Sequence, residues 1–222
     1  MIRTLNSINI LIIAFAINLY LIIIFCPAQF SPGIFVDTGV MSVLNMILIL
    51  TVWILILLHF INNPEQRLHW FCWLYIVQIY LFREADFHRA FFEEHVTKPS
   101  FYTMAQIPLW QKIIGGLIMS GFFATSIYTF LSNARRFMAA LVTREPWAIS
   151  FVLWFAFLLL SQVFDKTLAY ENPNWKLSSI EEMLEVTAAL YAVSAISLFS
   201  FKQWSDRKNE ISTVESNKKY GP

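Results

Sequence analysis

Charged residues are scarce in this sequence: they make up 14% of its 222 residues, whereas soluble domains carry about 25%. Hydrophobic residues make up 57%, so a soluble fold of this size would expose much apolar surface to water. Disordered chains are poor in aromatic residues and rich in net charge, but this chain is 17% aromatic with a formal net charge of +1. The composition therefore predicts a membrane protein.

Cysteine and histidine are also rare, with two and four residues respectively. Two cysteines exclude a disulfide scaffold and a cysteine-rich zinc or iron–sulfur site. Four histidines are too few for the histidine boxes of membrane desaturases. The pair Glu181 and Glu182 lacks the arginine that follows the glutamates of CAAX-type intramembrane endopeptidases, because Val186 stands in its place. The motifs of these enzyme families are therefore absent.

Six apolar stretches are long enough to cross about 30 Å of hydrocarbon as helices. Backbone amides in lipid must pair within their own segment, and the stretches lack the alternation of barrel strands. We therefore predict an all-α, polytopic membrane protein, with a bundle of six transmembrane helices in one domain, 1–204. The predicted spans are 8–25, 40–61, 68–83, 113–131, 147–164 and 183–201. The polar segment 205–222 is expected to be a cytoplasmic tail that passes from frayed helix into disorder.

The distribution of Lys and Arg between the spans predicts the orientation of the bundle. With both termini in the cytoplasm, the inner side carries ten basic and five acidic residues, and the outer side carries six and ten. No concentrated basic surface is present to neutralise phosphates along a nucleic acid, which excludes that partner. The sequence has no Asn-x-Ser/Thr sequon, which fits a multi-pass protein of a bacterial inner membrane.

Three polar segments interrupt the apolar pattern, and the predicted orientation places all of them on the outer side. They lie at 83–89, 161–166 and 178–185, next to the third, fifth and sixth spans. Ionisable side chains are costly at a membrane boundary and mark functional sites by default. We therefore expect these segments to meet in one outer vestibule. The candidate catalytic residues are Glu84, Asp86, His88, Asp165 and Glu185.

The same residues suit a divalent metal ion. Hard cations take carboxylate oxygens, whereas a mixed carboxylate–imidazole set suits Zn, Mn or Fe. In a continuous helix, Glu84 and His88 lie one turn apart on one face, and His95 adds a second imidazole if the helix extends that far. The candidate metal ligands are Glu84, Asp86, His88, Asp165, Glu182 and Glu185, and the supporting charges are Arg83, Arg89 and Lys166. The identity of the metal, and of any other cofactor, stays open.

The acidic residues of the third segment also have a structural interpretation. Ser178 with Glu181, and Ser179 with Glu182, both fit the capping box that begins a helix. Acidic residues in a first helical turn are favoured by the helix dipole, so capping accounts for Glu181 and Glu182. Glu185 lies one turn deeper, and capping does not explain it.

Asp165 and the segment 83–89 have a structural interpretation as well. Asp165 follows a helix, where the dipole disfavours an anion, so it needs a cation or hydrogen-bond donors nearby. An ion-pair network that ties the third span to the fifth and sixth would provide them, and we favour this network over a metal site.

Three classes of function are compatible with this pattern. The first is a membrane protein with a metal-dependent or acid–base site that acts on a lipid or a lipid-linked substrate. The second is an accessory subunit that binds a membrane-protein partner, with the polar segments as an ion-pair network. The third is a small transporter, which ranks lower because transporters carry polar residues near the bilayer midplane and show inverted repeats.

Other polar and small residues in the spans are expected to be structural. His59 and His69 flank the inner connection between the second and third spans, where we expect an interfacial or hydrogen-bonded structural role. Asn45 and Gln78 are expected to bridge helices. The basic pair Arg135–Arg136 is expected to meet anionic headgroups. Three glycines are expected to allow close helix packing: Gly115, Gly116 and Gly121.

Overall fold

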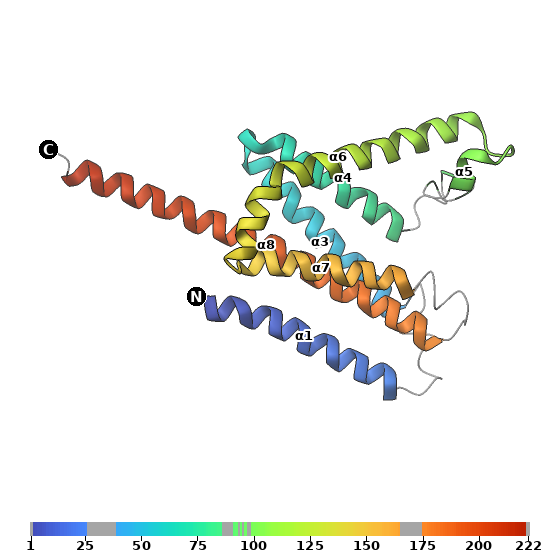
Figure 1. Ribbon diagram of the computed structural model, residues 1–222, viewed down its shortest axis with the longest axis horizontal. Helices are drawn as coiled ribbons and strands as arrows, with labels where there is room; N and C mark the ends of the chain where they lie inside the picture. The colour runs from blue at the N-terminus through green and yellow to red at the C-terminus, as the bar shows by residue number, and fades with distance from the viewer. Residues whose placement is uncertain are drawn as a thin grey trace. The chain divides into compact units, whose positions relative to one another are not determined.

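The computed structural model describes residues 2–25, 39–85, 91, 92, 94, 96, 99–164 and 175–220. Helix accounts for 91% of the structure, and the described residues contain no strand. In order, the elements are α1 (Ile2–Phe25), α3 (Val40–Asn62), the 3-10 helix η2 (Pro64–Gln66), α4 (Arg67–Glu84), α5 (Pro99–Thr103), α6 (Leu109–Val142), α7 (Pro146–Val163) and α8 (Trp175–Tyr220) (Figure 1). Each of the six predicted spans falls on one of these helices.

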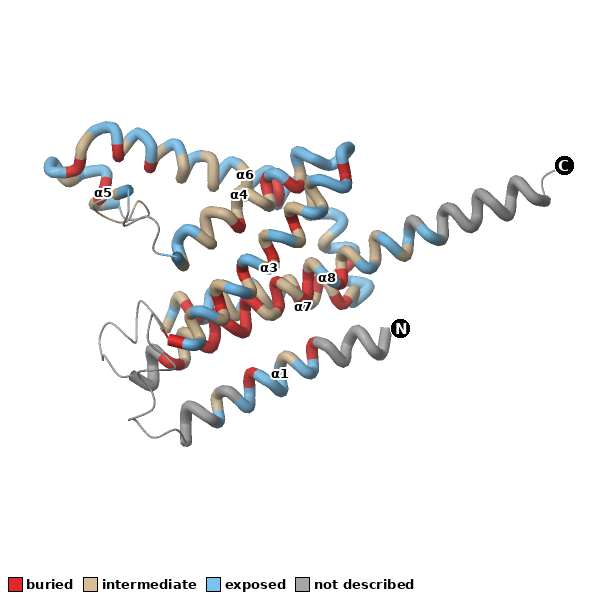
Figure 2. The backbone as a smooth tube through the Cα atoms, turned by 180° about the vertical axis from the view of Figure 1, so that it is seen from behind, coloured by how far each residue is buried: buried red, intermediate tan, exposed pale blue. Residues whose placement is uncertain are grey.

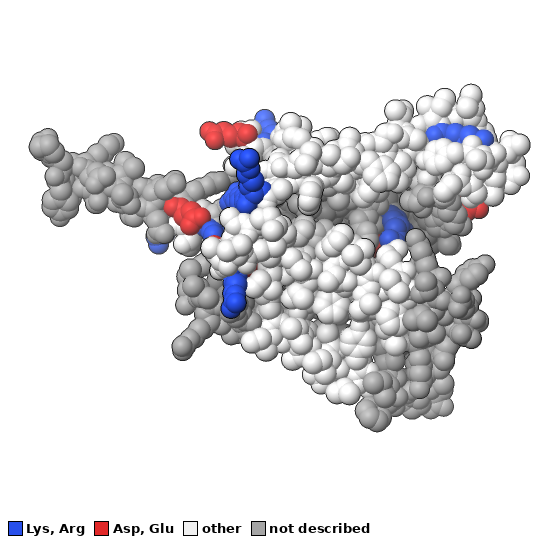
Figure 3. Space-filling view, viewed as in Figure 1, with Lys and Arg blue, Asp and Glu red and all other residues white. Residues whose placement is uncertain are grey.

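Four of the helical segments are long and apolar enough to cross a membrane. These segments are Val40–Asn62, Leu109–Val142, Pro146–Val163 and Ser179–Asp206. The all-helical fold, with helices long and apolar enough to cross a membrane, is therefore confirmed, whereas six spans and the orientation of the termini stay predictions. The face of the described structure drawn in Figure 3 carries few charged side chains, as contact with hydrocarbon requires.

The chain divides into two compact units. Unit 1 combines Met1–Ser42 with Leu141–Pro222, and unit 2 is Val43–Ala140. The sequence predicted a single domain over 1–204, and a common bundle of the two units stays a prediction. Each unit is therefore described by itself.

Unit 1 is built around α8, which packs against both α7 and α1. Of the apolar window of α8, 61% is buried inside the protein, and buried positions follow one another along this helix (Figure 2). Small side chains on α8 let the neighbouring helices approach closely. The buried alanines are Ala188, Ala189, Ala192 and Ala195. Beyond the apolar window, α8 continues as helix to Tyr220, through the segment that the sequence predicted to fray.

A buried cluster of polar side chains joins the three helices of unit 1. The Ser150 hydroxyl on α7 donates to Asn9 Oδ1 on α1 at 2.8 Å, and it lies 3.3 Å from Ser194 Oγ on α8. The Ser150 hydroxyl also lies within hydrogen-bond distance of the Pro146 carbonyl, at 3.0 Å. The Tyr191 hydroxyl, also on α8, donates to the backbone carbonyl of Asn9 at 3.3 Å. These bonds fix the register of α1 against α7 and α8.

The turn between α6 and α7 contains a strained residue. Arg144 has φ of 54°, in the left-handed region that favours glycine. The next residue, Glu145, precedes α7 and forms an ion pair with Lys202 on α8. The turn therefore combines a backbone conformation unfavourable for arginine with an anchoring charge pair.

Replacing Arg144 with glycine is expected to raise the thermal midpoint of unfolding in detergent. Glycine removes the steric cost of the left-handed conformation, worth about 1 kcal/mol, and a domain of this size shifts by about 2–4 °C per kcal/mol. Arg144→Ala is the control, because alanine keeps the steric cost and removes only the charge. An equal midpoint for the two variants would contradict the strain at this turn.

In unit 2, α4 and α6 approach closely where α6 carries a glycine. The Tyr75 hydroxyl on α4 donates to the backbone carbonyl of Ile118 on α6 at 3.1 Å. A Cβ atom on Gly121 would lie 2.9 Å from the Tyr75 oxygen. Gly115 has a similar role, since its Cβ would lie 3.0 Å from the ring of Phe101 on α5. The predicted packing role of these two glycines agrees with the structure.

The Gly121→Ala variant is expected to lose about 1–3 kcal/mol of stability, because the added methyl displaces the Tyr75 hydroxyl from its acceptor. Thermal unfolding in detergent measures the loss. Gly116→Ala is the matched control, since its Cβ would meet nothing closer than 4.0 Å. Adding Tyr75→Phe to Gly121→Ala should recover part of the loss by removing the atom that clashes. If the double variant is no more stable than Gly121→Ala, the added methyl does not clash with the Tyr75 hydroxyl.

Candidate functional site

The predicted site residues are described only in part. Asp86, His88, Arg89, His95, Asp165 and Lys166 lie outside the described residues. Glu84 and Arg83 belong to unit 2, whereas Glu182 and Glu185 belong to unit 1. The predicted shared vestibule therefore stays a prediction, and each half of the site is described within its own unit.

Glu185 is the most deeply buried acidic residue among those with described side chains. It is 7% exposed, within the membrane-length segment Ser179–Asp206. Its chain neighbours Leu184 and Val186 are 1% and 0% exposed. Burial in such apolar surroundings disfavours a carboxylate unless charges or hydrogen bonds compensate, and Glu185 does take part in such interactions. An acidic residue at this buried position therefore needs a structural or functional explanation.

Helix capping does not explain the glutamates at the start of α8. The α8 helix begins at Trp175, so Ser178 and Ser179 lie inside the helix. An N-cap residue stands at the helix boundary with a non-helical backbone. The capping-box interpretation of Glu181 and Glu182 is therefore wrong, because the apolar pattern from which it was derived begins later than the helix itself. The three glutamates lie in the second and third turns, where the helix dipole is weaker.

Unit 1 also contains two buried polar atoms, one on α7 and one on α8. Gln162 Nε2, in the last turn of α7, and Thr187 Oγ1, on α8, make no hydrogen bond with the described residues. Thr187 is 0% exposed, and a buried hydroxyl without a partner costs about 1–3 kcal/mol. Thr187 lies two residues after Glu185 on α8, so their side chains point to different faces of the helix.

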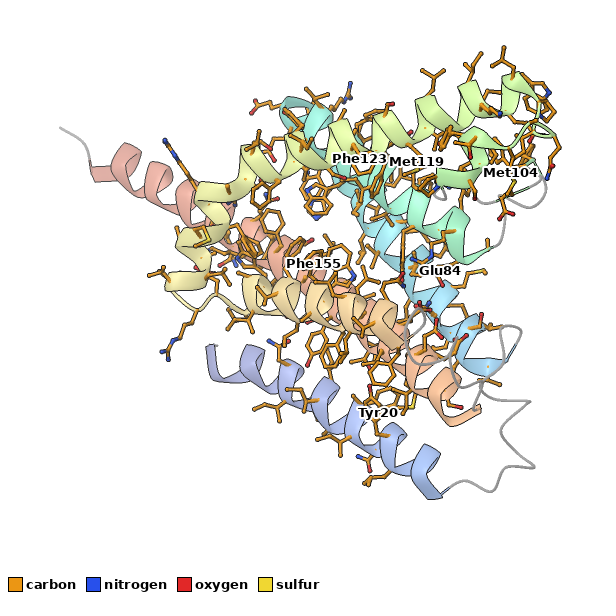
Figure 4. All side chains as sticks on the ribbon, turned by 45° about the vertical axis from the view of Figure 1, so that its right-hand side comes forward. Tyr20, Glu84, Met104, Met119, Phe123 and Phe155 are labelled. Atoms are coloured by element: carbon orange, nitrogen blue, oxygen red, sulfur yellow. The ribbon has the colours of Figure 1, made fainter. Side chains whose placement is uncertain are left out.

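Glu84 occupies a different environment at the end of α4 in unit 2 (Figure 4). Its side chain is 14% exposed, and Oε2 accepts a hydrogen bond of 3.1 Å from Nδ2 of Asn45 on α3. The predicted helix-bridging role of Asn45 is thus present in the structure. Arg83 Nε lies 3.6 Å from Glu84 Oε1, and its guanidinium lies 5.8 Å from the centre of the Tyr80 ring. The Glu84 carboxyl group therefore connects α3 and α4.

The described residues do not form a metal site by themselves. Among them, no group of three His, Cys, Asp or Glu side chains is arranged to hold a metal ion. A metal at Glu185 would therefore need a ligand such as Asp165, which lies outside them.

Sequence reasoning identified Glu185 and missed Gln162 and Thr187. Threonine in a helix ordinarily bonds to a backbone carbonyl one turn earlier, so no sequence signal distinguishes Thr187 from a satisfied threonine. Comparison with protein-family models, curated proteins and solved structures finds no match. Function is therefore inferred from the residues and their placement alone.

Proposed function

We propose that this chain is a multi-pass enzyme of the bacterial inner membrane with a metal-dependent or acid–base site on its outer face. The proposal includes six spans, both termini in the cytoplasm, and a lipid or lipid-linked substrate. The observation that carries it is the burial of Glu185 in a membrane-length helix. An ionisable group in that position is costly and marks a functional site by default.

The proposed chemistry combines Glu185 with two other acidic residues. Glu182 precedes Glu185 by one turn on the same helix face, and Asp165 follows α7 after a single residue. Together, these carboxylates would suit a divalent ion, which would polarise a phosphoryl or carbonyl oxygen and lower the pKa of bound water. Glu185 would accept a proton or bind the ion. The acyl chains would lie in the surrounding bilayer.

Metal analysis of the purified full-length protein tests this proposal. We expect about one equivalent of a divalent metal per chain, measured by inductively coupled plasma mass spectrometry after exhaustive dialysis. The double variant Glu185→Gln with Asp165→Asn should lose the metal, because it removes two anionic ligands while keeping the side-chain volume. Glu65→Gln is the matched control: Glu65 is an exposed glutamate in η2, and its removal should leave the metal content unchanged. Metal-free wild type, or metal retained in the double variant, would refute the proposal.

The arrangement around Glu84 favours a second candidate function. Glu84 already has an arginine and an asparagine as partners, which is what a structural ion-pair network requires. A chain with this network alone would serve as an accessory subunit of a membrane complex. Blue-native electrophoresis after mild solubilisation and crosslinking tests this alternative, since an accessory subunit should migrate in a larger complex. A stable, isolated monomer would exclude it.

A further inference from the structure

The short helix α5 packs against the first turns of α6 in unit 2 (Figure 1). Phe101 of α5 is 0% exposed, and a Cβ atom on Gly115 of α6 would come within 3.0 Å of its ring. The Phe101 ring also meets the Phe92 ring edge-on, with a centroid distance of 5.8 Å. A Cβ atom on Gly116 would meet the Tyr102 ring at 4.0 Å. These contacts hold α5 beside the two glycines.

The contact sets the level of α5 along α6. The predicted span of α6 begins at residue 113, so Gly115 and Gly116 lie inside it. At a rise of about 1.5 Å per residue, Gly115 lies about 3 Å beyond the start of the span. Where α6 crosses a bilayer, α5 therefore lies at the edge of the hydrocarbon. We call residues 99–112, from α5 to the first turn of α6, the anchor segment.

Side chains satisfy two backbone carbonyls in and beside the anchor segment. Lys112 Nζ donates to the Met104 carbonyl, which follows α5, at 2.7 Å. The Tyr102 hydroxyl donates to the Val96 carbonyl at 3.0 Å. Non-helical backbone is tolerated at membrane depth only where its polar groups have partners other than lipid. These two bonds therefore fit a segment that lies against lipid.

The exposed surface of the anchor segment is apolar and aromatic. Leu109 and Trp110 are 73% and 54% exposed, and Tyr102 is 37% exposed. The exposed side chains of Ile113 and Leu117 continue this surface along α6. Of the apolar window of α6, 11% is buried inside the protein, so most of this helix faces outward. Tryptophan and tyrosine are enriched where a bilayer meets water.

A lipid surface fits the anchor segment better than a protein partner does. Lys112 is the one charged residue among residues 99–112, and its ammonium group already donates to the Met104 carbonyl. Protein interfaces surround an apolar centre with a polar rim, and this segment has no further charge to supply one. The apolar surface is instead continuous with the face that α6 would present to hydrocarbon.

We propose that the anchor segment inserts into the lipid interface on the side of the α6 N-terminus. The inserted side chains are Tyr102, Ala105, Leu109 and Trp110. Because α6 has 34 residues and about 20 cross the hydrocarbon, its length alone does not fix its position along the membrane normal. The anchor segment fixes it. This inference rests on the membrane location included in the proposed function, and not on the chemistry proposed at Glu185.

Spin labelling of the full-length protein in liposomes tests the anchor segment. Ala105→Cys and Leu109→Cys place a nitroxide at two exposed positions, in a background without Cys26 and Cys72. Electron paramagnetic resonance measures the accessibility of each label to oxygen, which concentrates in lipid, and to a water-soluble nickel chelate. We expect the ratio of oxygen to chelate accessibility at both positions to be several-fold higher than at an aqueous position.

Two reference positions define lipid and water in the same experiment. Leu117→Cys, on the exposed apolar face of α6, is the lipid reference, and Glu65→Cys, in η2, is the aqueous reference. Position 105 is decisive, because Leu109 belongs to α6 itself. A ratio at position 105 equal to that of Glu65→Cys would overturn the anchor segment, while a high ratio at Leu117→Cys would still place α6 in lipid. Protection of position 105 from both reagents would show that protein covers the segment, and would overturn the lipid assignment. A low ratio at Leu117→Cys would overturn both the anchor segment and the membrane location of α6.

Discussion

The Tyr191→Ala variant is expected to lose about 3–5 kcal/mol of unfolding free energy, the usual cost of truncating a fully buried aromatic side chain. Tyr191 is 0% exposed and stacks on Phe157 with a centroid distance of 5.6 Å. Its hydroxyl also connects α8 to the backbone of α1. Truncation therefore leaves a cavity and removes one of the hydrogen bonds that hold α1. Thermal unfolding in detergent should show a fall in midpoint of more than about 6 °C.

Two tyrosine variants serve as controls for this loss. Tyr191→Phe keeps the ring and should lose about 1 kcal/mol, the contribution of one hydrogen bond. Tyr128→Ala truncates a tyrosine that is 41% exposed, so it should change the midpoint much less than Tyr191→Ala. A fall as small for Tyr191→Ala as for Tyr128→Ala would contradict the packing of unit 1 around α8.

The Glu185→Gln variant is expected to abolish the effect of a chelator on stability. If Glu185 binds a metal, saturating metal stabilises the folded wild type by about 2.7 kcal/mol at a hundredfold excess over the dissociation constant. A chelator should therefore lower the wild-type midpoint and leave that of the variant unchanged. Without metal, the variant should be at least as stable as the wild type, because the amide carries no charge to desolvate.

A structural role for Glu185 predicts the opposite pattern. If the carboxylate is paired with a cation, Glu185→Gln leaves that cation uncompensated and destabilises the protein by several kcal/mol. The chelator would then change neither midpoint. The unfolding curves of both proteins, with and without chelator, therefore distinguish a metal site from an ion pair.

The sequence predicted the helices well because crossing a bilayer demands long apolar runs. It underestimated their lengths: α6 spans Leu109–Val142 and α8 spans Trp175–Tyr220, beyond the predicted 113–131 and 183–201. Helices continue where polar residues follow the apolar run, since their backbone bonds do not depend on hydropathy. Because α8 begins at Trp175, before Ser178, the predicted capping box at Ser178 and Ser179 was wrong.

The sequence alone did not predict the polar contacts inside unit 1. Asn9, Ser150 and Ser194 are single polar residues within apolar spans, and no periodicity indicates that they meet. Their partners depend on how three helices rotate about their axes, which packing determines. Glu185 was identified because a charge inside an apolar run is costly wherever it points. The contacts of the His59 and His69 rings with Trp70 appear only in three dimensions.

The account depends on a carboxylate at position 185 that is buried in a membrane helix and yet open to the outer aqueous phase. Cysteine labelling in membrane vesicles of known sidedness tests this most directly, in a background without Cys26 and Cys72. Glu185→Cys should react with a small, membrane-impermeant thiol reagent from the outer side. Ser194→Cys, on the same helix and equally 7% exposed, should remain unlabelled. Equal protection of both positions, or labelling of position 185 only from the cytoplasmic side, would contradict the account.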